Sequence, residues 1–270
     1  MSDVRIGIVG CAGRMGLALI REVINTPNCI LVGGSERPDS AAVGRDLGDI
    51  AGLELLGYTV TGNSESLFID ADVVLDFTTS TTTVAHAEMA AASRTALVIG
   101  TTGLEARHIA ALETAAQNTP IMQAANMSLG VNLLVQLTRQ VAHILDPDFD
   151  IEIIEMHHRY KVDAPSGTAL ALGRAAAEGR GVELDKVAVR GRDGMPGERQ
   201  RGDIGFAVLR GGNVVGDHSV MFAADNERIE LSHRATDRTI FARGATRAAL
   251  WTHGKPPSLY SMADVLGFES

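Results

Sequence analysis

The 270-residue chain has few aromatic residues and carries no excess of basic charge. Phenylalanine, tryptophan and tyrosine make up only 4% of it, although 45% of all residues are hydrophobic. Aliphatic side chains and alanine therefore build most of the core, which is typical of a parallel sheet covered by helices on both faces. The formal net charge of −9 repels phosphate backbones, so we expect no nucleic-acid partner.

Cysteine and long apolar runs are also scarce. Cys11 and Cys29 are the two cysteines, too few for a disulfide framework. No apolar run is long enough to span a bilayer, and the first ten residues form a short apolar run broken by glycines, unlike a signal peptide. We therefore expect a cytoplasmic protein that does not bind membranes.

The first half of the chain alternates between strand and helix patterns. The expected strands are Val4–Val9, Cys29–Gly33, Ala71–Asp76, Ala96–Ile99 and Pro120–Gln123, and the expected helices run from the first glycine turn to about Ile24, over Thr81–Arg94 and over Leu104–Asn118. This alternation predicts a parallel, doubly wound α/β sheet. Residues 34–70 are rich in Gly, Ser and Asp, and beyond one alternating piece at Leu53–Val60 they suggest no element.

The pattern changes near residue 128, which predicts a domain boundary there. The expected elements beyond it are a helix capped by Ser128 and running to Leu145, a strand over Phe149–His157, a helix over Ser166–Glu178, strands and turns over Val187–Ser232, and a helix over Thr239–Leu250. Within the strand-rich part, Gly211-Gly212-Asn213 is typical of a β-hairpin turn.

Three glycines, Gly10, Gly13 and Gly16, lie between the first strand and the first helix. Glycines at such a turn let the backbone approach a pyrophosphate, and the helix start offers N–H groups and a partial positive charge to the phosphates. The spacing is G-x-x-G-x-x-G instead of the commoner G-x-G-x-x-G, and the bare pattern also fits a turn without a ligand. Its position at the first strand–helix junction favours a dinucleotide.

An acidic and a basic residue follow the second strand, in the run Ser35-Glu36-Arg37. An acidic side chain at this place accepts hydrogen bonds from the adenosine ribose hydroxyls. Arg37 can instead pair with a 2′-phosphate. The two together predict that NADH and NADPH are both usable.

Three later strands also end in small residues, at Phe77–Ser80, Gly100–Gly103 and Ala124–Met127. Ligands of a doubly wound sheet bind outside the carboxyl ends of its strands. Small residues there let the backbone approach a nicotinamide ring and its ribose, although each stretch alone also fits an ordinary turn.

The densest polar cluster is Glu155–Ala169, between a predicted strand and a predicted helix. Ser166 can cap that helix, so the N–H groups of Gly167 and Thr168 open an anion-binding helix start. With Lys161 nearby, this end suits a substrate with two carboxylates. A solvated surface loop is the alternative, and the helix start directly after the cluster argues against it.

His157 and Lys161 are the candidate proton donors. Hydride delivery to an electron-poor C=C or C=N leaves a carbanion or an amine, which a nearby His or Lys can protonate. Adjacent histidines on a strand point to opposite faces and chelate one metal poorly, so we expect no metal site at His157 and His158.

The whole chain resembles the dihydrodipicolinate reductase family of the bacterial and plant lysine and diaminopimelate pathway. The matching runs are Gly10–Gly16, Asp76–Thr79, Gly100–Gly103, His157–Thr168, Ile204–Phe206, Gly216–Val220 and Phe241–Ala245. The resemblance implies NAD(P)H-dependent reduction of 4-hydroxy-tetrahydrodipicolinate, through its dehydrated form, to tetrahydrodipicolinate.

The resemblance also implies an architecture and a set of roles. A Rossmann-like domain of residues 1–128 would be completed by 238–270, and an α+β domain of residues 129–237, with a mixed, largely open sheet, would bind substrate and join copies into a homotetramer. His157 and Lys161 would be the acid–base pair, and His158, Gly167 and Thr168 would bind the substrate carboxylates. The expected cofactor residues are Gly10, Cys11, Ala12, Gly13, Arg14, Met15, Glu36, Arg37, Gly100, Thr101, Thr102, Ala124, Ala125, Asn126 and Met127.

Two other functions compete with this one. A dehydrogenase of similar build acting on an amino acid such as aspartate is disfavoured by the His157–Thr168 run, and a dinucleotide sensor without catalysis has no use for His157 together with Lys161. Met127 departs from the family, because many relatives carry Phe there; we expect altered nicotinamide packing but retained binding. Cys11 occupies a variable position of the turn.

Overall fold

The computed structural model describes residues 3–268 and divides them into two compact units, each described by itself. Unit 1 comprises the described residues up to Ser128 and those from Thr239 onward, and unit 2 comprises Leu129–Arg238. The sequence places the return to the first unit at residue 238, one residue earlier than the structure does. Over residues 3–268, no helix is long and apolar enough to cross a membrane.

Unit 1 is built on a six-stranded sheet in which every neighbouring pair is parallel. Its strands are β1 (Val4–Val9), β2 (Cys29–Ser35), β3 (Val73–Asp76), β4 (Ala96–Ile99), β5 (Pro120–Gln123) and β11 (Ser258–Tyr260), in the order β11-β5-β4-β3-β1-β2. The chain passes from β1 outward to β2, then returns to β3 on the other side of β1. This reversal is the switch point at which an α/β sheet opens a crevice at the carboxyl ends of its strands.

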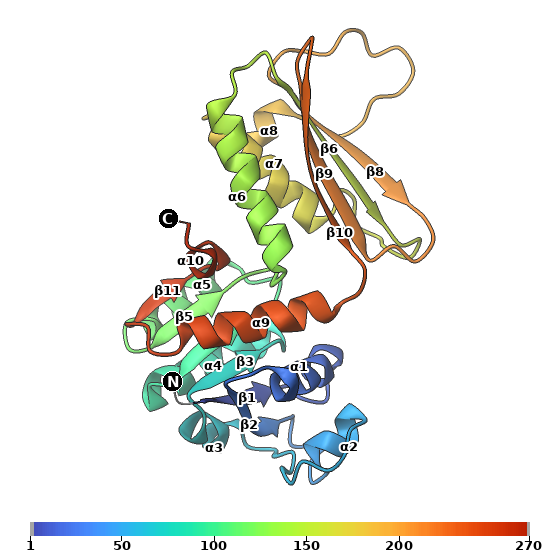
Figure 1. The fold of residues 1–270 in the computed structure, drawn as a ribbon. Coiled ribbons are helices and arrows are strands. Elements are labelled where there is room, and N and C mark those ends of the chain that lie inside the picture. Colours follow the sequence, from blue (N-terminus) through green and yellow to red (C-terminus); the bar gives the residue numbers. More distant parts are fainter. Residues whose placement is uncertain (1–2, 269–270) are drawn as a thin grey trace. The chain divides into compact units, whose positions relative to one another are not determined.

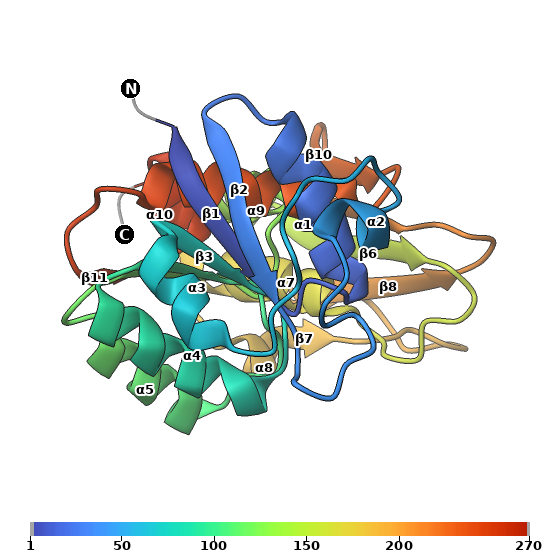
Figure 2. The same cartoon turned by 90° about the horizontal axis from the view of Figure 1, so that it is seen from below.

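Helices cover both faces of this sheet, as the doubly wound prediction requires. The helices of unit 1 are α1 (Arg14–Asn25), α2 (Leu47–Ala51), α3 (Ser64–Asp70), α4 (Ser80–Ser93), α5 (Ala106–Ala115), α9 (Thr239–Thr252) and α10 (Met262–Leu266). Helices α3, α4 and α5 lie together on one face, and α1 and α9 lie on the other (Figures 1 and 2). The edge strand β11 and helix α10 follow α9, and the sequence patterns did not predict them.

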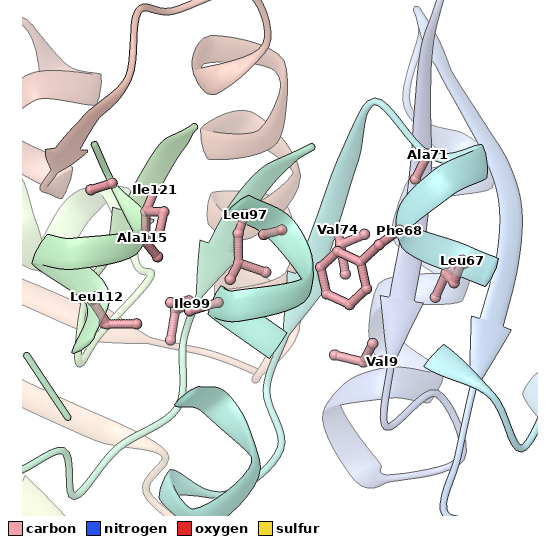
Figure 3. Close-up of a cluster of buried hydrophobic side chains, with 13 residues drawn as sticks. Val9, Leu67, Phe68, Ala71, Val74, Leu97, Ile99, Leu112, Ala115 and Ile121 are labelled. Carbon is pink, nitrogen blue, oxygen red and sulfur yellow. The ribbon is translucent and has the colours of Figure 1, made fainter. Parts of the chain in front are cut away.

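The core under α3, α4 and α5 is aliphatic apart from one ring. Phe68 of α3 lies next to Val74 of β3, and Leu97 and Ile99 of β4 lie beside Leu112 of α5 (Figure 3). The four-residue strands β3 and β4 are buried along their whole length. Continuous burial explains why these strands read as unbroken apolar runs, as expected for a central parallel strand.

The segment 34–70 folds mainly through tertiary contacts. The carboxylate of Asp46 caps the five-residue helix α2 through the N–H groups of Gly48 and Asp49, and it also accepts from the N–H groups of Leu56 and Gly57. The alternating piece Leu53–Val60 therefore forms a loop that is held by the Asp46 carboxylate and by backbone hydrogen bonds, among them that from Leu47 N–H to the Tyr58 carbonyl. Its sheet-like contact is a bridge between Thr59 and Asp46.

Unit 2 contains a mixed five-stranded sheet. Its strands are β6 (Asp150–His157), β7 (Ala188–Val189), β8 (Ile204–Arg210), β9 (Gly216–Ala223) and β10 (Arg228–Ala235), in the order β10-β9-β6-β8-β7. Its helices are α6 (Leu129–Ile144), α7 (Gly167–Gly179) and α8 (Leu184–Val187). Helices α6 and α7 lie against one face of the sheet (Figure 1), and Ile151, Ile153, Phe206 and Phe222 are buried between them and the strands.

The expected hairpin at Gly211-Gly212-Asn213 is wrong. These residues connect β8 to β9, but β6 lies between the two strands, parallel to β8 and antiparallel to β9. The turn crosses the end of β6 instead: Gly211 N–H donates to the His157 carbonyl at 3.0 Å, and His158 N–H donates to the Val214 carbonyl at 2.8 Å. The turn chemistry is local, whereas the strand that separates its two arms pairs with β8 across 53 residues of sequence.

Candidate active site

The glycine turn of unit 1 forms as predicted and leads directly into α1. Gly10 has φ +68°, a conformation that favours glycine, and Gly13 is the N-cap of α1. A Cβ at Gly16 would lie 2.3 Å from the Gly10 carbonyl oxygen, so only glycine lets α1 begin this close to the turn. The sequence predicts a close backbone approach to a ligand here, and the structure adds a close approach of the turn to its own helix.

The N–H groups of the turn divide into two sets. Those of Gly10 and Cys11 donate to the Ser35 carbonyl at 2.8 and 3.1 Å, and that of Ala12 donates to Glu36 Oε1 at 3.0 Å. Because Gly13 has no side chain, no N-cap oxygen competes for the N–H groups of Met15 and Gly16. The free N–H groups at the start of α1, together with the positive end of the helix dipole, are therefore available to bind an anion.

A cavity of about 390 Å³ opens beside this turn, at the switch point of the sheet. Of the predicted cofactor residues, Gly10, Gly13, Glu36 and Arg37 line it. The rest of its lining is Val9, Ser35, Pro38, Gly62, Ser64, Phe77, Thr78, Thr79, Thr82 and His86. Sequence reasoning missed Gly62 and Ser64 because they fall in the unassigned segment, and it missed His86 because a lone histidine in a helix carries no signal.

Asp76, at the end of β3, holds together the loops next to this cavity. The buried carboxylate accepts hydrogen bonds from Thr78 N–H at 2.9 Å and Thr101 Oγ1 at 3.3 Å, and it lies 2.9 Å from His86 Nδ1. Burial opposes its ionisation, but the contacts with His86 and Thr78 outweigh burial and hold the pKa of Asp76 below its usual value. One buried charge thus ties together the loops that follow β3 and β4.

The other two predicted cofactor stretches also follow strands of this sheet, Gly100–Thr102 after β4 and Ala124–Met127 after β5. Neither is part of the lining of the 390 Å³ cavity. A Cβ at Gly100 would collide with the ring of Phe77, and a Cβ at Gly244 of α9 would lie 1.7 Å from the Met127 carbonyl oxygen. Met127 is only 2% exposed, and its carbonyl oxygen packs against Gly244 of α9.

Cys11 sits in the turn as a buried, neutral thiol. Burial, followed by the nearby charge of Glu36, raises its pKa to about 12. A thiolate beside a pyrophosphate would repel it, so this raised pKa keeps the turn free of negative charge from that side chain.

In unit 2 the predicted polar residues follow β6. His157 is the last residue of the strand, and its Nδ1 lies 2.5 Å from Glu155 Oε2. Lys161 Nζ lies 2.8 Å from both carboxylate oxygens of Asp163, and its side chain is only 19% exposed. The pKa of Asp163 is held below its usual value, chiefly by the hydrogen bond from Lys161.

Helix α7 begins next to these groups, with Ser166 as its N-cap. Ser166 Oγ accepts from Ala169 N–H at 3.2 Å and lies 3.0 Å from His218 Nε2. A Cβ at Gly167 would meet no atom within 4 Å, so open space adjoins the first residue of the helix. The predicted anion-binding helix start of Gly167 and Thr168 therefore lies at the surface of unit 2.

Sequence reasoning assigned no role to Glu155, Arg210 or His218, all of which the fold brings beside His157. The rings of His157 and His218 are 5.1 Å apart and nearly perpendicular. Burial, then the charge of His157, lowers the pKa of His218 to about 4. The alternation of β6 could have indicated Glu155, two residues before His157 on the same face, whereas Arg210 and His218 come from other strands. Over residues 3–268, no group of three His, Cys, Asp or Glu side chains is arranged to hold a metal ion.

The sequence matches two family models that together span almost all of it. Residues 4–127 match "Dihydrodipicolinate reductase, N-terminus", and residues 130–266 match "Dihydrodipicolinate reductase, C-terminus". The chain is 57% identical to the 4-hydroxy-tetrahydrodipicolinate reductase of Ruegeria pomeroyi over 97% of each chain. It is 55% identical to that of Parvibaculum lavamentivorans over 99% of each chain.

Solved structures give the same result. The dipicolinate-bound dihydrodipicolinate reductase from Paenisporosarcina sp. TG-14 superposes with a TM-score of 0.80 at 26% identity, over 97% of this chain and 98% of that one. An amine dehydrogenase from Mycobacterium smegmatis superposes with a TM-score of 0.59 at 14% identity, over 97% of this chain and 95% of that one, which is a similarity of fold alone.

Proposed function

The chain belongs to the dihydrodipicolinate reductase family and has 4-hydroxy-tetrahydrodipicolinate reductase activity in lysine biosynthesis, and we propose that it draws hydride from either NADH or NADPH bound to unit 1. The observation that carries this proposal is the switch-point cavity, where the glycine turn, the start of α1 and the Glu36–Arg37 pair meet. Unit 2 receives the substrate.

The residues of unit 1 fit a dinucleotide. The uncapped start of α1 supplies N–H groups and positive potential to the pyrophosphate. Glu36 already accepts from Ala12 N–H, which fixes its carboxylate at the edge of the cavity, where it can also accept from ribose hydroxyls. Arg37 is 78% exposed and only loosely paired with Asp39 at 3.9 Å, so it is free to turn toward a 2′-phosphate. Gly100–Thr102 and Ala124–Met127 are assigned to the nicotinamide side.

The residues of unit 2 fit a small dicarboxylate, the class of ligand that dipicolinate represents in the Paenisporosarcina reductase. We assign one carboxylate to the N–H groups of Gly167 and Thr168 at the start of α7. His158 serves the same ligand, because its Nδ1 is buried without a hydrogen-bond partner among the described residues and needs one.

His157 and Lys161 are assigned the proton chemistry. The substrate first loses water to give its dehydrated form, and the bound nicotinamide supplies the hydride for the two-electron reduction. His157 and Lys161 supply the matching proton, so that one hydride and one proton are added for each molecule reduced. Asp163 accepts a hydrogen bond from Lys161 Nζ at 2.8 Å, which holds that side chain in place.

We propose further that four copies assemble through the open face of the sheet in unit 2. The residues of this face include Ile154, Met156, Ala207, Leu209 and Met221, which alternate with the residues packed under α6 and α7. Leu209 is 50% exposed. Glu152, Asp217 and Ser219 lie on the same face, and a face that combines apolar and polar residues in this way is suited to pack against the same face of a second copy.

A coupled assay tests the proposed cofactor and proton donors. A synthase makes the substrate from pyruvate and aspartate semialdehyde, and loss of NADH or NADPH is followed at about 340 nm, the usual nicotinamide wavelength. We expect synthase-dependent oxidation of both cofactors. Replacing His157 by Gln or Lys161 by Met should lower kcat by about 10²- to 10⁴-fold, the range of general acid catalysis, with little change in cofactor Kd.

The same assay separates the competing functions. An amino-acid dehydrogenase would oxidise or reduce its cofactor without the synthase, and a sensor would bind NADH without any turnover. Near-normal kcat in either variant would remove that residue from the role of proton donor. His253→Gln, an exposed histidine of unit 1, is the control and should leave kcat unchanged.

A further inference from the structure

A buried carboxylate lies directly beneath the proposed proton donor. Glu155 is 1% exposed and stands two residues before His157 on β6, so both side chains point to the face of the sheet that carries α7. The 2.5 Å contact between Glu155 Oε2 and His157 Nδ1 is a short hydrogen bond, as expected when one partner is charged.

Every other group that touches this carboxylate is a hydrogen-bond donor that cannot accept. Arg210 Nη1 donates to Oε2 at 2.8 Å, and Nη2 donates to Oε1 at 2.9 Å. The backbone N–H of Ser166 donates to Oε1 at 3.0 Å. Burial opposes ionisation of Glu155, but the bonds from Arg210, His157 and Ser166 outweigh burial and hold its pKa below the usual value. Glu155 is therefore an anion that only accepts.

An accepting partner fixes the tautomer of His157. Because Glu155 has no proton to give, Nδ1 of His157 must carry a hydrogen, and Nε2 is left as the nitrogen that gains and releases a proton. On that side of the ring stands Gly216 of β9, where a Cβ would lie 3.0 Å from Nε2. Gly216 has no side chain and so leaves room beside Nε2, the nitrogen that gains and releases the proton in this tautomer.

The same carboxylate also reaches the anion-binding end of α7. Its Oε1 holds the N–H of the N-cap residue Ser166, and its partner Arg210 donates to the Asp163 carbonyl at 2.7 Å. Strand β6, strand β8, the loop carrying Lys161 and the start of α7 all meet at this one ion pair.

We propose that Glu155 is a positioning residue of the reductase reaction. Its carboxylate holds His157 as the Nδ1–H tautomer, with Nε2 as the proton-donating atom, and keeps the ring at a fixed position relative to the start of α7. The inference rests on the proposed role of His157 as proton donor. Arg210 serves Glu155 in turn by occupying both carboxylate oxygens, which keeps the anion from rotating away from the ring.

The test is a double-mutant cycle between Glu155 and His157. A Gln at position 155 must place its NH₂ group against one of the three donors, so the tautomer and position of His157 are no longer fixed. We expect Glu155→Gln to lower kcat by about 10²-fold while cofactor Kd stays within about threefold. In a His157→Gln background the same substitution should change kcat by less than about threefold, because two residues that act through one proton donor are not additive.

The variants and the control separate positioning from folding. Glu155→Asp keeps the charge but shortens the side chain, so its kcat should fall between those of the wild type and Glu155→Gln, and it should show the same loss of effect in the His157→Gln background. Asp72→Asn is the matched control. It removes a carboxylate that is also paired with an arginine, Arg5, at 2.8 Å. Asp72 belongs to unit 1 and does not line the switch-point cavity, so kcat should be unchanged.

The outcomes are distinct. If Glu155→Gln or Glu155→Asp lowers kcat by the same factor with and without His157, Glu155 acts through the fold and the proposal is overturned. Unchanged kcat in both Glu155 variants overturns it as well. If His157→Gln alone retains full kcat, the proposed function loses its proton donor, a result that does not depend on any Glu155 variant.

Discussion

At the scale of single residues, the proposed use of NADH and NADPH rests on Glu36 and Arg37, which are held in different ways. Glu36 is tied to the glycine turn through Ala12 N–H, whereas the guanidinium of Arg37 is exposed and nearly unpaired. A fixed carboxylate recognises ribose hydroxyls, and a mobile arginine can meet a 2′-phosphate when one arrives or stay in solvent when none does. This difference between the two side chains supports the proposal that both cofactors are used.

Replacing Arg37 by Ala should therefore raise the Kd for NADPH and leave that for NADH within about twofold. A hydrogen bond to a charged group contributes about 1.5–3 kcal/mol, which corresponds to an increase of roughly 10- to 100-fold for NADPH. Fluorescence titration with each cofactor measures both values. Arg107→Ala, an exposed arginine of α5, is the control, and equal weakening of both cofactors would contradict the assignment.

His218 predicts how the stability of unit 2 depends on pH. Burial lowers its folded pKa from 6.5 to about 4, so between these values the unfolded chain binds more protons than the folded chain. Stability is then complete above about pH 6.5 and is lost as pH falls toward about 4. Between pH 7 and pH 5 the expected loss is about 2 kcal/mol.

Urea unfolding of the wild type and of His218→Gln at pH 7 and pH 5 checks this contribution. The variant lacks the titrating ring, so its stability should fall by about 2 kcal/mol less than that of the wild type over the same interval. His143→Gln, an exposed histidine in α6 of the same unit, should behave like the wild type. An equal pH dependence in wild type and His218→Gln would show that His218 is protonated in the folded state.

At the scale of elements, the start of α7 combines a side-chain N-cap with the proposed carboxylate site. Ser166 Oγ accepts from Ala169 N–H, and the N–H groups after it are assigned to a substrate carboxylate. The helix α10 begins in the same way, since Ser261 Oγ accepts from Ala263 N–H, but it belongs to unit 1.

Ser166→Ala and Ser261→Ala therefore form a matched pair. Each should lower the unfolding free energy by about 1 kcal/mol through loss of an N-cap. Only Ser166→Ala should also raise KM for the substrate and the inhibition constant of pyridine-2,6-dicarboxylate, by roughly 3- to 10-fold, because it loosens the helix start that binds carboxylates. Comparable changes in both variants would mean that the start of α7 contributes stability alone.

Elements with strong internal patterns could be predicted from the sequence, and those held by distant partners could not. The buried strands β3 and β4 and the helix capped by Ser166 appear where the sequence places them. The loop 53–60 depends on the Asp46 carboxylate and on backbone hydrogen bonds to residues 44–48, and the insertion of β6 between β8 and β9 depends on pairing across at least 53 residues. The turn at Gly211 was recognised, but its partners were not.

The candidate site divides in the same way. Residues within one continuous run, such as His157, Lys161 and Ser166, could be found together because the run itself is dense in reactive groups. Arg210 and His218 lie beside His157 only because β8 and β9 pair with β6, so no local sequence pattern indicates their role. The contacts that position the proposed proton donor are thus the part of the site that required the fold.

At the scale of the whole molecule, the proposed assembly uses the open face of the sheet in unit 2. Replacing Leu209 by Arg would place a charge near the end of β8, on the face proposed to pack against a second copy, where its desolvation is costly. We expect the species seen by sedimentation velocity at micromolar concentration to change from about four chains to one or two, without loss of folded structure by circular dichroism. Ile69→Arg, at a 69% exposed position in unit 1, should leave the mass unchanged. A Leu209→Arg protein with the mass of the wild type would exclude this face as the interface, and would require another surface to hold the copies together.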